Sequence, residues 1–417
     1  MQTETRHLNI LVGQSGGPTA VINSTLYGIL KARSVYREIT GIYGMINGIE
    51  GYLKGSMTDL SLLSQEDQEL LKTTPGAYLG SCRYKMPEDQ TSPIYQKMFD
   101  RLREDQIDIV LYIGGNDSMD TVAKLSDYAL KTGSPICFVG IPKTIDNDLC
   151  ETDHTPGYGS AAKFVASNVR QIVMDAEVYQ TKAVTIVEIM GRNAGWLTAA
   201  AKAARKYPED NPLLIYLPEV NFYMDRMLDD IRELLKTRNA IVICISEGIH
   251  DDHGTLICEM GGRSATDVFG HKLLAGAGKV LENTIRQELG VKVRSVELNV
   301  TQRSSAVEAS FTDVMEAVAC GVKGVELAME GWSGFMVTMH RTEDKVLYDI
   351  DYRGTRVTKV SNEVKSFPIE WITKGGTDIS DEFLSYLIPL IQGESYPPME
   401  NGLPRFIYRK QSIGQEF

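Results

Sequence analysis

The chain has 417 residues, a hydrophobic fraction of 43%, and 43 Lys and Arg against 55 Asp and Glu, which gives a formal net charge of −12. This length has room for two domains and a third small unit at about 150 residues per domain, and the acidic balance argues against a broad nucleic-acid surface, because phosphate backbones are bound by excess Lys and Arg. No apolar run approaches the roughly 20 residues of a membrane span, the N-terminus shows no secretory-signal pattern, and the six cysteines form no CxxC pair, so we expect a cytoplasmic globular protein without a disulfide framework.

The first predicted unit is a strand at residues 8–12, a glycine-rich turn with the sequence QSGGPTAVIN, and a helix that ends near Ala32. Small residues after a strand let backbone N–H groups and a helix N-terminus approach an anion, and phosphate is the anion most often bound in this way. The spacing matches neither the dinucleotide fingerprint nor the Walker loop. By itself, a Gly-Gly turn is more often only a tight connection.

A polar strand end follows further along the chain. After a loop that contains Arg83, a continuous apolar strand at residues 107–113 ends in GGNDS before a helix at residues 119–130. The two glycines let a ligand approach the backbone, while Asn116 and Asp117 stand at the helix entry. The simpler interpretation of one such residue is a helix N-cap, but that interpretation is weaker for a whole polar strand end.

The most informative stretch is VGIPKTIDNDL at residues 139–149. A β-branched strand runs into a turn that carries Lys143, Thr144, Asp146 and Asp148. In an extended segment the two carboxylates would point the same way, so they could share a metal or divide the roles of base and metal ligand. Carboxylates, a cation and a hydroxyl at a strand end suit phosphoryl transfer, where catalysis is mostly positioning and charge neutralisation.

The rest of the chain continues the alternation of strands and helices. The pattern predicts a long amphipathic helix after the GYGSAAK motif, further helices at residues 197–206, 225–237, 272–289 and 312–329, and strands at residues 183–190, 213–217, 240–245, 292–298 and 335–340. About nine strands with helices between them are typical of parallel α/β sheets. Residues 341–417 are more polar and irregular, and we expect them to pack on the core as an appendage.

Polar residues recur where the strands end. Besides the stretches above, these ends carry Met190, Gly191 and Arg192, then Glu247, then Arg303. In a doubly wound sheet all of them face the crevice at the carboxyl edge, where ligands bind. A surface salt bridge or an acidic residue at a helix N-terminus would explain any one of them. Six strand ends that each carry residues suited to binding an anion indicate a phosphate-binding site.

From about Leu8 to about His340, the chain closely resembles the phosphofructokinases, and in particular the pyrophosphate-dependent type. The motifs that carry the resemblance are QSGG, LGSCR, GGND, PKTIDND, GYGSAAK, EIMGRNAGW, SEG and QR. The resemblance implies an α/β fold of two Rossmann-like three-layer domains with mostly parallel sheets and an active site in the cleft between them. The expected division is a phosphoryl-donor domain at residues 1–157 plus about 302–345, a sugar-phosphate domain at residues 158–301, and the C-terminal appendage at residues 346–417.

The resemblance also implies roles for individual residues. Asp146 would take the proton from the 1-hydroxyl of fructose 6-phosphate, with Lys143, Asp117 and Arg192 as further catalytic residues. The sugar phosphate would be held by Thr144, Ile145, Asp146, Met190, Gly191, Arg192, Glu247, Arg294 and Arg303, with Arg294 reaching from a neighbouring subunit. The diphosphate would be bound by Gly17, Arg83, Asp117 and Lys143, and Mg²⁺ by Asn116 and Asp148. Relatives commonly carry Asp at the position of Asn116, so in this chain Asn116 is expected to reach the metal through water.

Two positions bear on the phosphoryl donor. ATP-using relatives have Gly at the positions of Asp117 and Lys143. In this chain a buried carboxylate at Asp117 would repel the α-phosphate of a nucleotide, while Lys143 would offset the charge of pyrophosphate. The expected reaction is therefore a reversible, Mg²⁺-dependent phosphoryl transfer from pyrophosphate to fructose 6-phosphate, giving fructose 1,6-bisphosphate and phosphate in glycolysis.

Two alternatives stay open at this stage. One is an ATP-dependent 6-phosphofructokinase, or a kinase of another sugar phosphate such as sedoheptulose 7-phosphate. The other is a non-catalytic subunit that senses sugar phosphates, although a sensor would not need the set of Lys143, Asp146, Asp148 and Arg192. The resemblance further implies a homodimer or homotetramer with sites completed across subunits.

Overall fold

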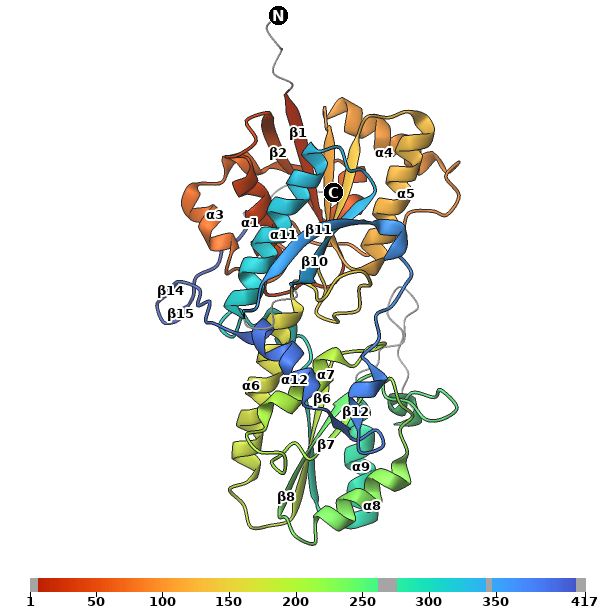
Figure 1. Ribbon diagram of the computed structural model, residues 1–417, viewed down its shortest axis with the longest axis vertical. Helices are drawn as coiled ribbons and strands as arrows, with labels where there is room; N and C mark the ends of the chain where they lie inside the picture. The colour runs from red at the N-terminus through yellow and green to blue at the C-terminus, as the bar shows by residue number, and fades with distance from the viewer. Residues whose placement is uncertain (1–6, 262–275, 343–346, 410–417) are drawn as a thin grey trace, which may run out of the picture.

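Two separate β-sheets form the framework of the protein (Figure 1). The computed structural model describes residues 7–261, 276–342 and 347–409. One sheet has seven strands in the order β11-β10-β5-β4-β1-β2-β3, and the other has four in the order β7-β8-β6-β9. The predicted α/β fold with mostly parallel sheets is confirmed.

The seven-stranded sheet is parallel except at its two edges. Its parallel strands are β1 (Leu8–Gln14), β2 (Ile39–Met45), β4 (Ile109–Gly114), β5 (Cys137–Pro142) and β10 (Phe335–Arg341). The antiparallel edge strands are β3 (Met57–Asp59) and β11 (Ile350–Arg356), which the sequence pattern did not predict. Since β11 belongs to the C-terminal segment, that segment extends the sheet as well as packing on the core.

Helices cover both faces of this sheet. Helices α1 (Ile22–Ala32) and α11 (Phe311–Met329) share one apolar core with one face, and α4 (Pro93–Glu104) and α5 (Asn116–Thr132) share another core with the opposite face. The contact between α1 and α11 is very close, because a Cβ added at Gly28 would lie 2.1 Å from the carbonyl oxygen of Val318. Three short helices complete this part of the chain: α2 (Gly48–Leu53), α3 (Gln65–Leu71) and, beside α6, α10 (Thr301–Ser304).

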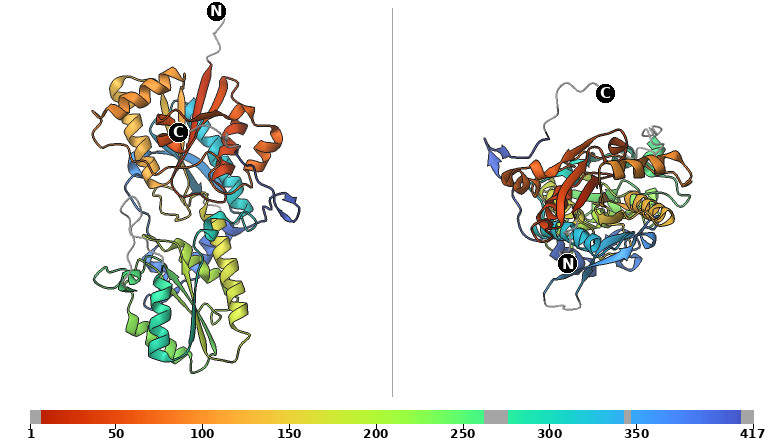
Figure 2. Two further views of the ribbon diagram at one scale, coloured as in Figure 1. Left: turned by 180° about the vertical axis from the view of Figure 1, so that it is seen from behind. Right: turned by 90° about the horizontal axis from the view of Figure 1, so that it is seen from above.

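The four-stranded sheet is entirely parallel. It contains β6 (Ala183–Ile189), β7 (Leu214–Tyr216), β8 (Ala240–Ser246) and β9 (Lys292–Glu297). Helices α6 (Tyr158–Ala176) and α7 (Trp196–Ala199) pack on one face, and α8 (Met224–Leu234) and α9 (Ala277–Leu289) on the other (Figure 2). The helix predicted at residues 197–206 is shorter, because the chain tightens into a 3₁₀ turn at Ala200–Ala204. The first part of the helix predicted at 272–289 lies outside the described residues.

The sheet membership of the strands supports the division that we propose, with breaks near residues 157 and 302. The chain leaves the large sheet after β5, builds the small sheet from β6 to β9, and returns through α11 to β10, which pairs with β5. Within the three described ranges, no helix combines the length and the apolar character that a membrane span requires.

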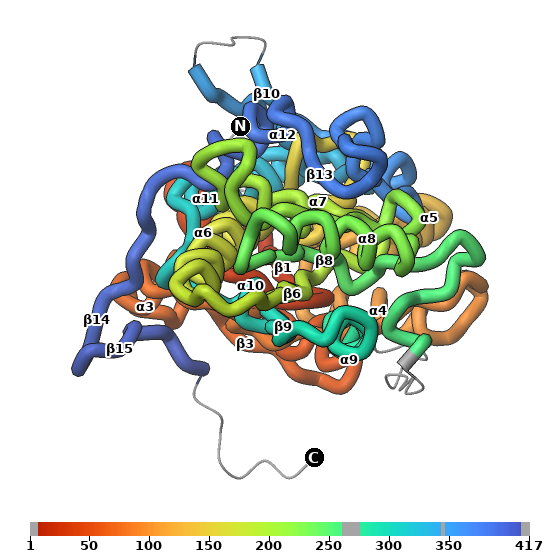
Figure 3. The backbone as a smooth tube through the Cα atoms, turned by 90° about the horizontal axis from the view of Figure 1, so that it is seen from below, coloured from red at the N-terminus to blue at the C-terminus, as the bar shows by residue number. Residues whose placement is uncertain are grey.

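The C-terminal segment crosses from one sheet to the other. After β11 it runs down to the small sheet, where Phe367, Trp371, Phe383 and Tyr386 pack around Trp196 of α7. Its remaining elements are β12 (Ile372–Thr373), β13 (Asp378–Ile379), α12 (Glu382–Leu387), β14 (Met399–Glu400) and β15 (Leu403–Pro404). The β14–β15 pair lies at the side of the molecule beside α3 (Figure 3).

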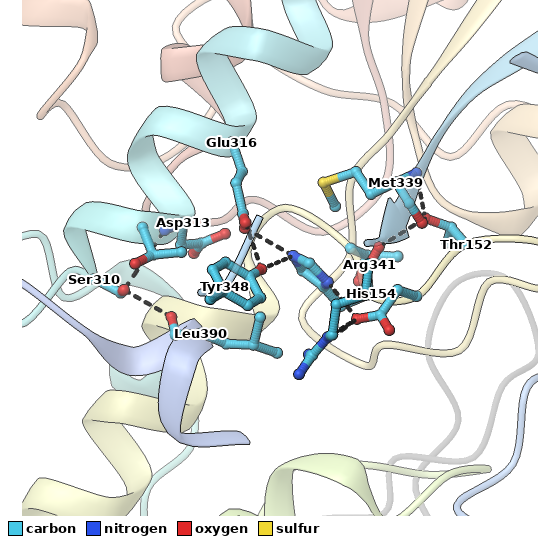
Figure 4. Close-up of polar contacts among 12 residues, drawn as sticks. Thr152, His154, Ser310, Asp313, Glu316, Met339, Arg341, Tyr348 and Leu390 are labelled. Carbon is cyan, nitrogen blue, oxygen red and sulfur yellow. Dashed lines mark hydrogen bonds and ion pairs between the residues drawn. The ribbon is translucent and has the colours of Figure 1, made fainter. Parts of the chain in front are cut away.

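A buried polar network joins the loop after β5 to α11 (Figure 4). The His154 ring lies between two carboxylates, with Nδ1 2.8 Å from Asp153 Oδ1 and Nε2 2.7 Å from Glu316 Oε2. The hydroxyl of Tyr348 donates to the other oxygen of Glu316 at 2.6 Å. Although burial opposes the charged ring, the two carboxylates raise the pKa of His154 to about 9, so the imidazole is protonated at neutral pH.

Candidate active site

A cavity of about 560 Å³ opens at the carboxyl edge of the large sheet, where β1, β4 and β5 end. This is the edge at which ligands bind in open α/β sheets. Eight of the predicted site residues line it: Gly17, Arg83, Asn116, Asp117, Lys143, Thr144, Asp146 and Asp148. The remaining lining residues are Ser15, Gly16, Cys82, Tyr84, Lys85, Gly115 and Ser118.

Lys143 is the buried cation of this cavity. The residue is 2% exposed, and its Nζ donates to the carbonyl oxygen of Gly17 at 2.6 Å. Burial lowers the pKa of Lys143 to about 8, although the nearby carboxylate of Asp146 opposes the shift. The glycine-rich turn after β1 therefore holds an ammonium group that faces the space where a phosphate would lie.

The two carboxylates of the TIDND turn share the cavity, but the segment between them is not extended. Asn147 has a φ of +56° and is buried, so the chain bends between Asp146 and Asp148. The Thr144 hydroxyl accepts the backbone N–H of Asp146 at 3.1 Å and donates to its carboxylate at 3.3 Å. The expectation of an extended segment was wrong, and tertiary structure rather than strand alternation brings the carboxylates together.

The pKa values of both carboxyl groups are raised above their ordinary range. Burial raises the pKa of Asp146, and the bond from Thr144 and the charges of Lys143, Arg303 and Arg192 act in the opposite direction. Burial, followed by the charge of Asp146, raises the pKa of Asp148 to about 6. Two partly buried carboxyl groups beside each other are a common arrangement where one group accepts a proton and another binds a cation.

Asp117 differs from expectation. It stands in the first turn of α5, where its side chain is 74% exposed and its Oδ1 lies 3.2 Å from Nζ of Lys85. The sequence predicted a buried carboxylate, and this was wrong because Asp117 lies on the outward side of the first turn of α5, whereas Ser118 and Met119 of that turn are buried. Asp117 therefore lines the cavity as an exposed carboxylate paired with Lys85, a residue that the sequence reasoning had not considered.

The donor set for a metal is sparse. The described residues contain no group of three or more His, Cys, Asp and Glu that could hold a metal ion. The Asn116 oxygen accepts the backbone N–H of Asn362 at 2.7 Å, so it is already engaged. Mg²⁺ in phosphoryl-transfer sites is held by one or two carboxylates plus substrate oxygens and water. The cavity fits such a substrate-carried ion, and Asp148 is the carboxylate of its lining that would hold it.

Residues at the ends of β6 and β8 lie beside this site but line a separate small depression, which includes Met190, Glu247 and Gln302. The Gly191 N–H donates to Glu247 Oε1 at 3.3 Å, so the ends of β6 and β8 are joined there. A Cβ on Gly17 would lie 3.1 Å from Nη1 of Arg303, which places this guanidinium against the turn after β1. The charges of Arg303 and Arg192 both act on Asp146. The Met190 N–H is held by the Gln302 side chain at 3.2 Å.

Two predicted residues are placed elsewhere. The Ile145 side chain is buried in the core of the small sheet, so only its backbone is available to a ligand. Arg294 lies on β9, and its Nη1 is 3.4 Å from Asp175 Oδ2 on α6, beside a separate depression. A role for Arg294 in the site of a neighbouring subunit stays a prediction.

The sequence reasoning missed two lysines near the site. Lys85 follows Arg83 by two residues in the same loop, so a second cation on that loop was visible in the sequence. Lys365, whose backbone N–H donates to the carbonyl oxygen of Asp148 at 2.8 Å, comes from the polar C-terminal segment. No local pattern marks it, because its place depends on contacts more than 200 residues apart along the chain.

Known proteins resemble this chain over nearly its whole length. Pyrophosphate–fructose 6-phosphate 1-phosphotransferase of Halomonas elongata is 37% identical over 401 residues, which are 95% of each chain. A sulfofructose kinase of Alkalicoccus urumqiensis is 34% identical over 372 residues, 88% of this chain and 90% of the other. The crystal structure of a pyrophosphate-dependent phosphofructokinase from Nitrosospira multiformis superposes with a TM-score of 0.88 at 32% identity, covering 99% of each chain. The family model described as Phosphofructokinase matches residues 9–328, and the chain therefore belongs to the phosphofructokinase family.

Proposed function

We propose that this protein transfers a phosphoryl group from pyrophosphate to the 1-hydroxyl of fructose 6-phosphate, reversibly, giving fructose 1,6-bisphosphate and phosphate. The observation that carries the proposal is the cavity itself. It combines one buried ammonium, from Lys143, with the carboxylates of Asp146 and Asp148 beside a glycine-rich turn. Relatives named for this activity support it at 36–37% identity over at least 92% of the chain.

Asp146 acts on the acceptor in this proposal. Its carboxylate accepts the proton of the 1-hydroxyl while that oxygen forms a bond to the terminal phosphorus of pyrophosphate and the bridging P–O bond breaks. The electron pair of the broken bond stays on the departing phosphate. The raised pKa of Asp146 favours the transfer, since a more basic carboxylate holds the proton better. The charges of Arg192 and Arg303 favour the ionised form of Asp146, and in this proposal both residues bind the phosphate of the sugar.

Lys143 acts on the donor. Its ammonium is fixed by the Gly17 carbonyl and faces the cavity, so it neutralises charge that develops on the departing phosphate without reorganising. Asp148 would hold Mg²⁺ together with pyrophosphate, and the ion would supply further neutralisation of the phosphoryl oxygens. Gly115 and the turn at Gly17 leave room for the donor to approach the backbone.

The test compares donors and acceptors with the purified protein. With fructose 6-phosphate and Mg²⁺, we expect fructose 1,6-bisphosphate to form with pyrophosphate and to form at least about 100-fold more slowly with ATP, a ratio typical of a site built for one ligand. Comparable or faster turnover with ATP would overturn the choice of donor.

A second experiment compares acceptors, because the chain is also similar to a sulfofructose kinase. Sulfofructose and sedoheptulose 7-phosphate are offered at the same concentration as fructose 6-phosphate, with pyrophosphate and then ATP. We expect the highest kcat/KM with fructose 6-phosphate. A higher kcat/KM with another acceptor would reassign the substrate, and binding without turnover of any acceptor would favour the sensing role.

A further inference from the structure

Residues 360–367 of the C-terminal segment, here called the strap, contact the loops of both sheets that carry the proposed site. At its start the strap holds the β4–α5 turn: the Asn116 amide donates to the carbonyl oxygens of Val360 at 3.3 Å and Glu363 at 2.5 Å, and its oxygen accepts the N–H of Asn362 at 2.7 Å. These bonds fix the strap to the end of the large sheet next to the cavity.

Lys365, in the middle of the strap, holds the TIDND turn at two places. Its backbone N–H donates to the carbonyl oxygen of Asp148 at 2.8 Å. Its ammonium donates to the carbonyl oxygens of Asp153 at 2.8 Å and Thr152 at 3.1 Å, and lies 3.5 Å from Asn147 Oδ1. An ammonium has three donors, and this one faces three oxygen acceptors. The residue thus joins the outgoing limb of the turn to the limb that returns towards α6.

The same residue contacts the loop that follows β6. Its carbonyl oxygen accepts the indole N–H of Trp196 at 2.9 Å, and its ammonium lies 5.1 Å from the centre of the Trp196 ring. Two residues later, the N–H of Phe367 donates to Glu219 at 2.8 Å, and the same carboxylate oxygen accepts the N–H of Gly195 at 2.8 Å. The loop held in this way is the one that begins with Met190, Gly191 and Arg192.

We propose that Lys365 is a positioning residue that holds the TIDND turn of the large sheet and the loop after β6 of the small sheet in one fixed arrangement. The inference rests on the proposed function, since it assigns Lys365 a part in setting Asp146 against the acceptor bound by Arg192. Lys365 touches neither substrate in this account. Its backbone would keep the strap in place in any variant, whereas the ammonium alone closes the turn through Thr152 and Asp153.

The first test separates the ammonium from the backbone by chemical rescue. In Lys365→Ala, kcat with pyrophosphate and fructose 6-phosphate should fall about 100-fold, the usual cost of a displacement near 1 Å at a reacting group, while both KM values change less than about threefold. Propylammonium, which replaces the missing part of the side chain, should raise the kcat of Lys365→Ala by at least about tenfold, because it supplies the three lost donors. Propanol of the same shape should not.

The matched control is Lys359→Ala. Lys359 lies just before the strap, is 64% exposed and is 3.8 Å from Glu151. Its variant should keep wild-type kcat and show no response to propylammonium. Wild-type kcat in Lys365→Ala would overturn the inference. A loss of kcat that propylammonium does not reverse would also overturn the inference, because the loss would then arise from the backbone contacts of the strap and not from the ammonium.

A second readout does not depend on activity. Hydrogen exchange of backbone amides in peptides that cover residues 144–153 should be about fivefold faster in Lys365→Ala, slow again with propylammonium, and remain unchanged in Lys359→Ala. Unchanged exchange in Lys365→Ala would refute the positioning role whether or not the enzyme uses pyrophosphate, whereas an inactive wild-type protein would refute the proposed function. If Lys365→Ala does not fold, Lys365→Gln takes its place, and wild-type kcat and exchange in that variant would overturn the inference.

Discussion

Replacing Lys143 by methionine tests the central electrostatic claim. Nζ lies 2.6 Å from the Gly17 carbonyl oxygen, at the wall of the cavity that would receive pyrophosphate. Two unit charges about 4 Å apart interact by about 4 kcal/mol at an effective dielectric constant near 20. Part of this attraction acts already on bound pyrophosphate and would appear in KM. The part that grows as charge moves onto the departing phosphate would appear in kcat, and losing one preorganised donor costs about 10²- to 10³-fold there.

The assay follows formation of fructose 1,6-bisphosphate over a range of pyrophosphate concentrations, with Lys131→Met as the control. Lys131 stands near the far end of α5, is 62% exposed and pairs with Asp127. Lys143→Met should lower kcat by about 10²- to 10³-fold, because one preorganised donor is lost from the cavity. A fall in kcat smaller than about tenfold, or an equal fall in Lys131→Met, would show that the Lys143 ammonium does not stabilise the transition state.

Three further predictions follow from groups described above. Asp146→Asn should lower kcat by about 10²- to 10⁴-fold with little change in KM. In the wild type, kcat should fall as the pH is lowered, since burial raises the pKa of this base. Wild-type kcat in Asp146→Asn would exclude Asp146 as the base. His154 has a folded pKa of about 9 against 6.5 unfolded, so its stabilising contribution is complete below pH 6.5 and is lost as pH rises through 9. The free energy of unfolding of the wild type should drop by about 3 kcal/mol over that pH window. In urea titrations at several pH values, His154→Gln should lack this drop. An equal dependence on pH in the two proteins would contradict the charged network with Glu316. Gly28→Ala should lower the free energy of unfolding by about 1–3 kcal/mol, the usual cost of overpacking, because its Cβ would lie 2.1 Å from the Val318 carbonyl oxygen; an unchanged urea midpoint would show that α1 and α11 separate freely.

The polar strand ends were predictable because of the geometry of parallel sheets. The apolar runs predict parallel strands, and parallel strands end at the same edge of their sheet. The turns after β1, β4 and β5 therefore had to meet at that edge. Gly17, Asp146 and Asp148 line one cavity for that reason. The edge strands were not predictable in the same way: β11 has the sequence IDYRGTR, in which polar residues outnumber apolar ones and give no clear apolar run.

The misplaced and missed residues share a different cause. Whether Asp117 is buried depends on where the first turn of α5 faces, and whether Lys365 reaches Asp148 depends on a crossing by a segment with no regular pattern. Local sequence rules report spacing within one element, while these contacts join elements that are far apart in the chain. Three-dimensional contacts were needed to place both residues.

The pairing of β10 with β5 has a consequence for how the chain folds as it is synthesised. Roughly 190 residues separate Pro142 from Phe335, so at about 5–20 residues per second the ribosome needs about 10–40 seconds to deliver the partner of β5. During that interval the large sheet has β5 as an open edge, while the whole small sheet is translated and is able to form. The part of the protein that begins first is therefore completed last, and the exposed edge of β5 is the site where a chaperone or an unwanted strand would act.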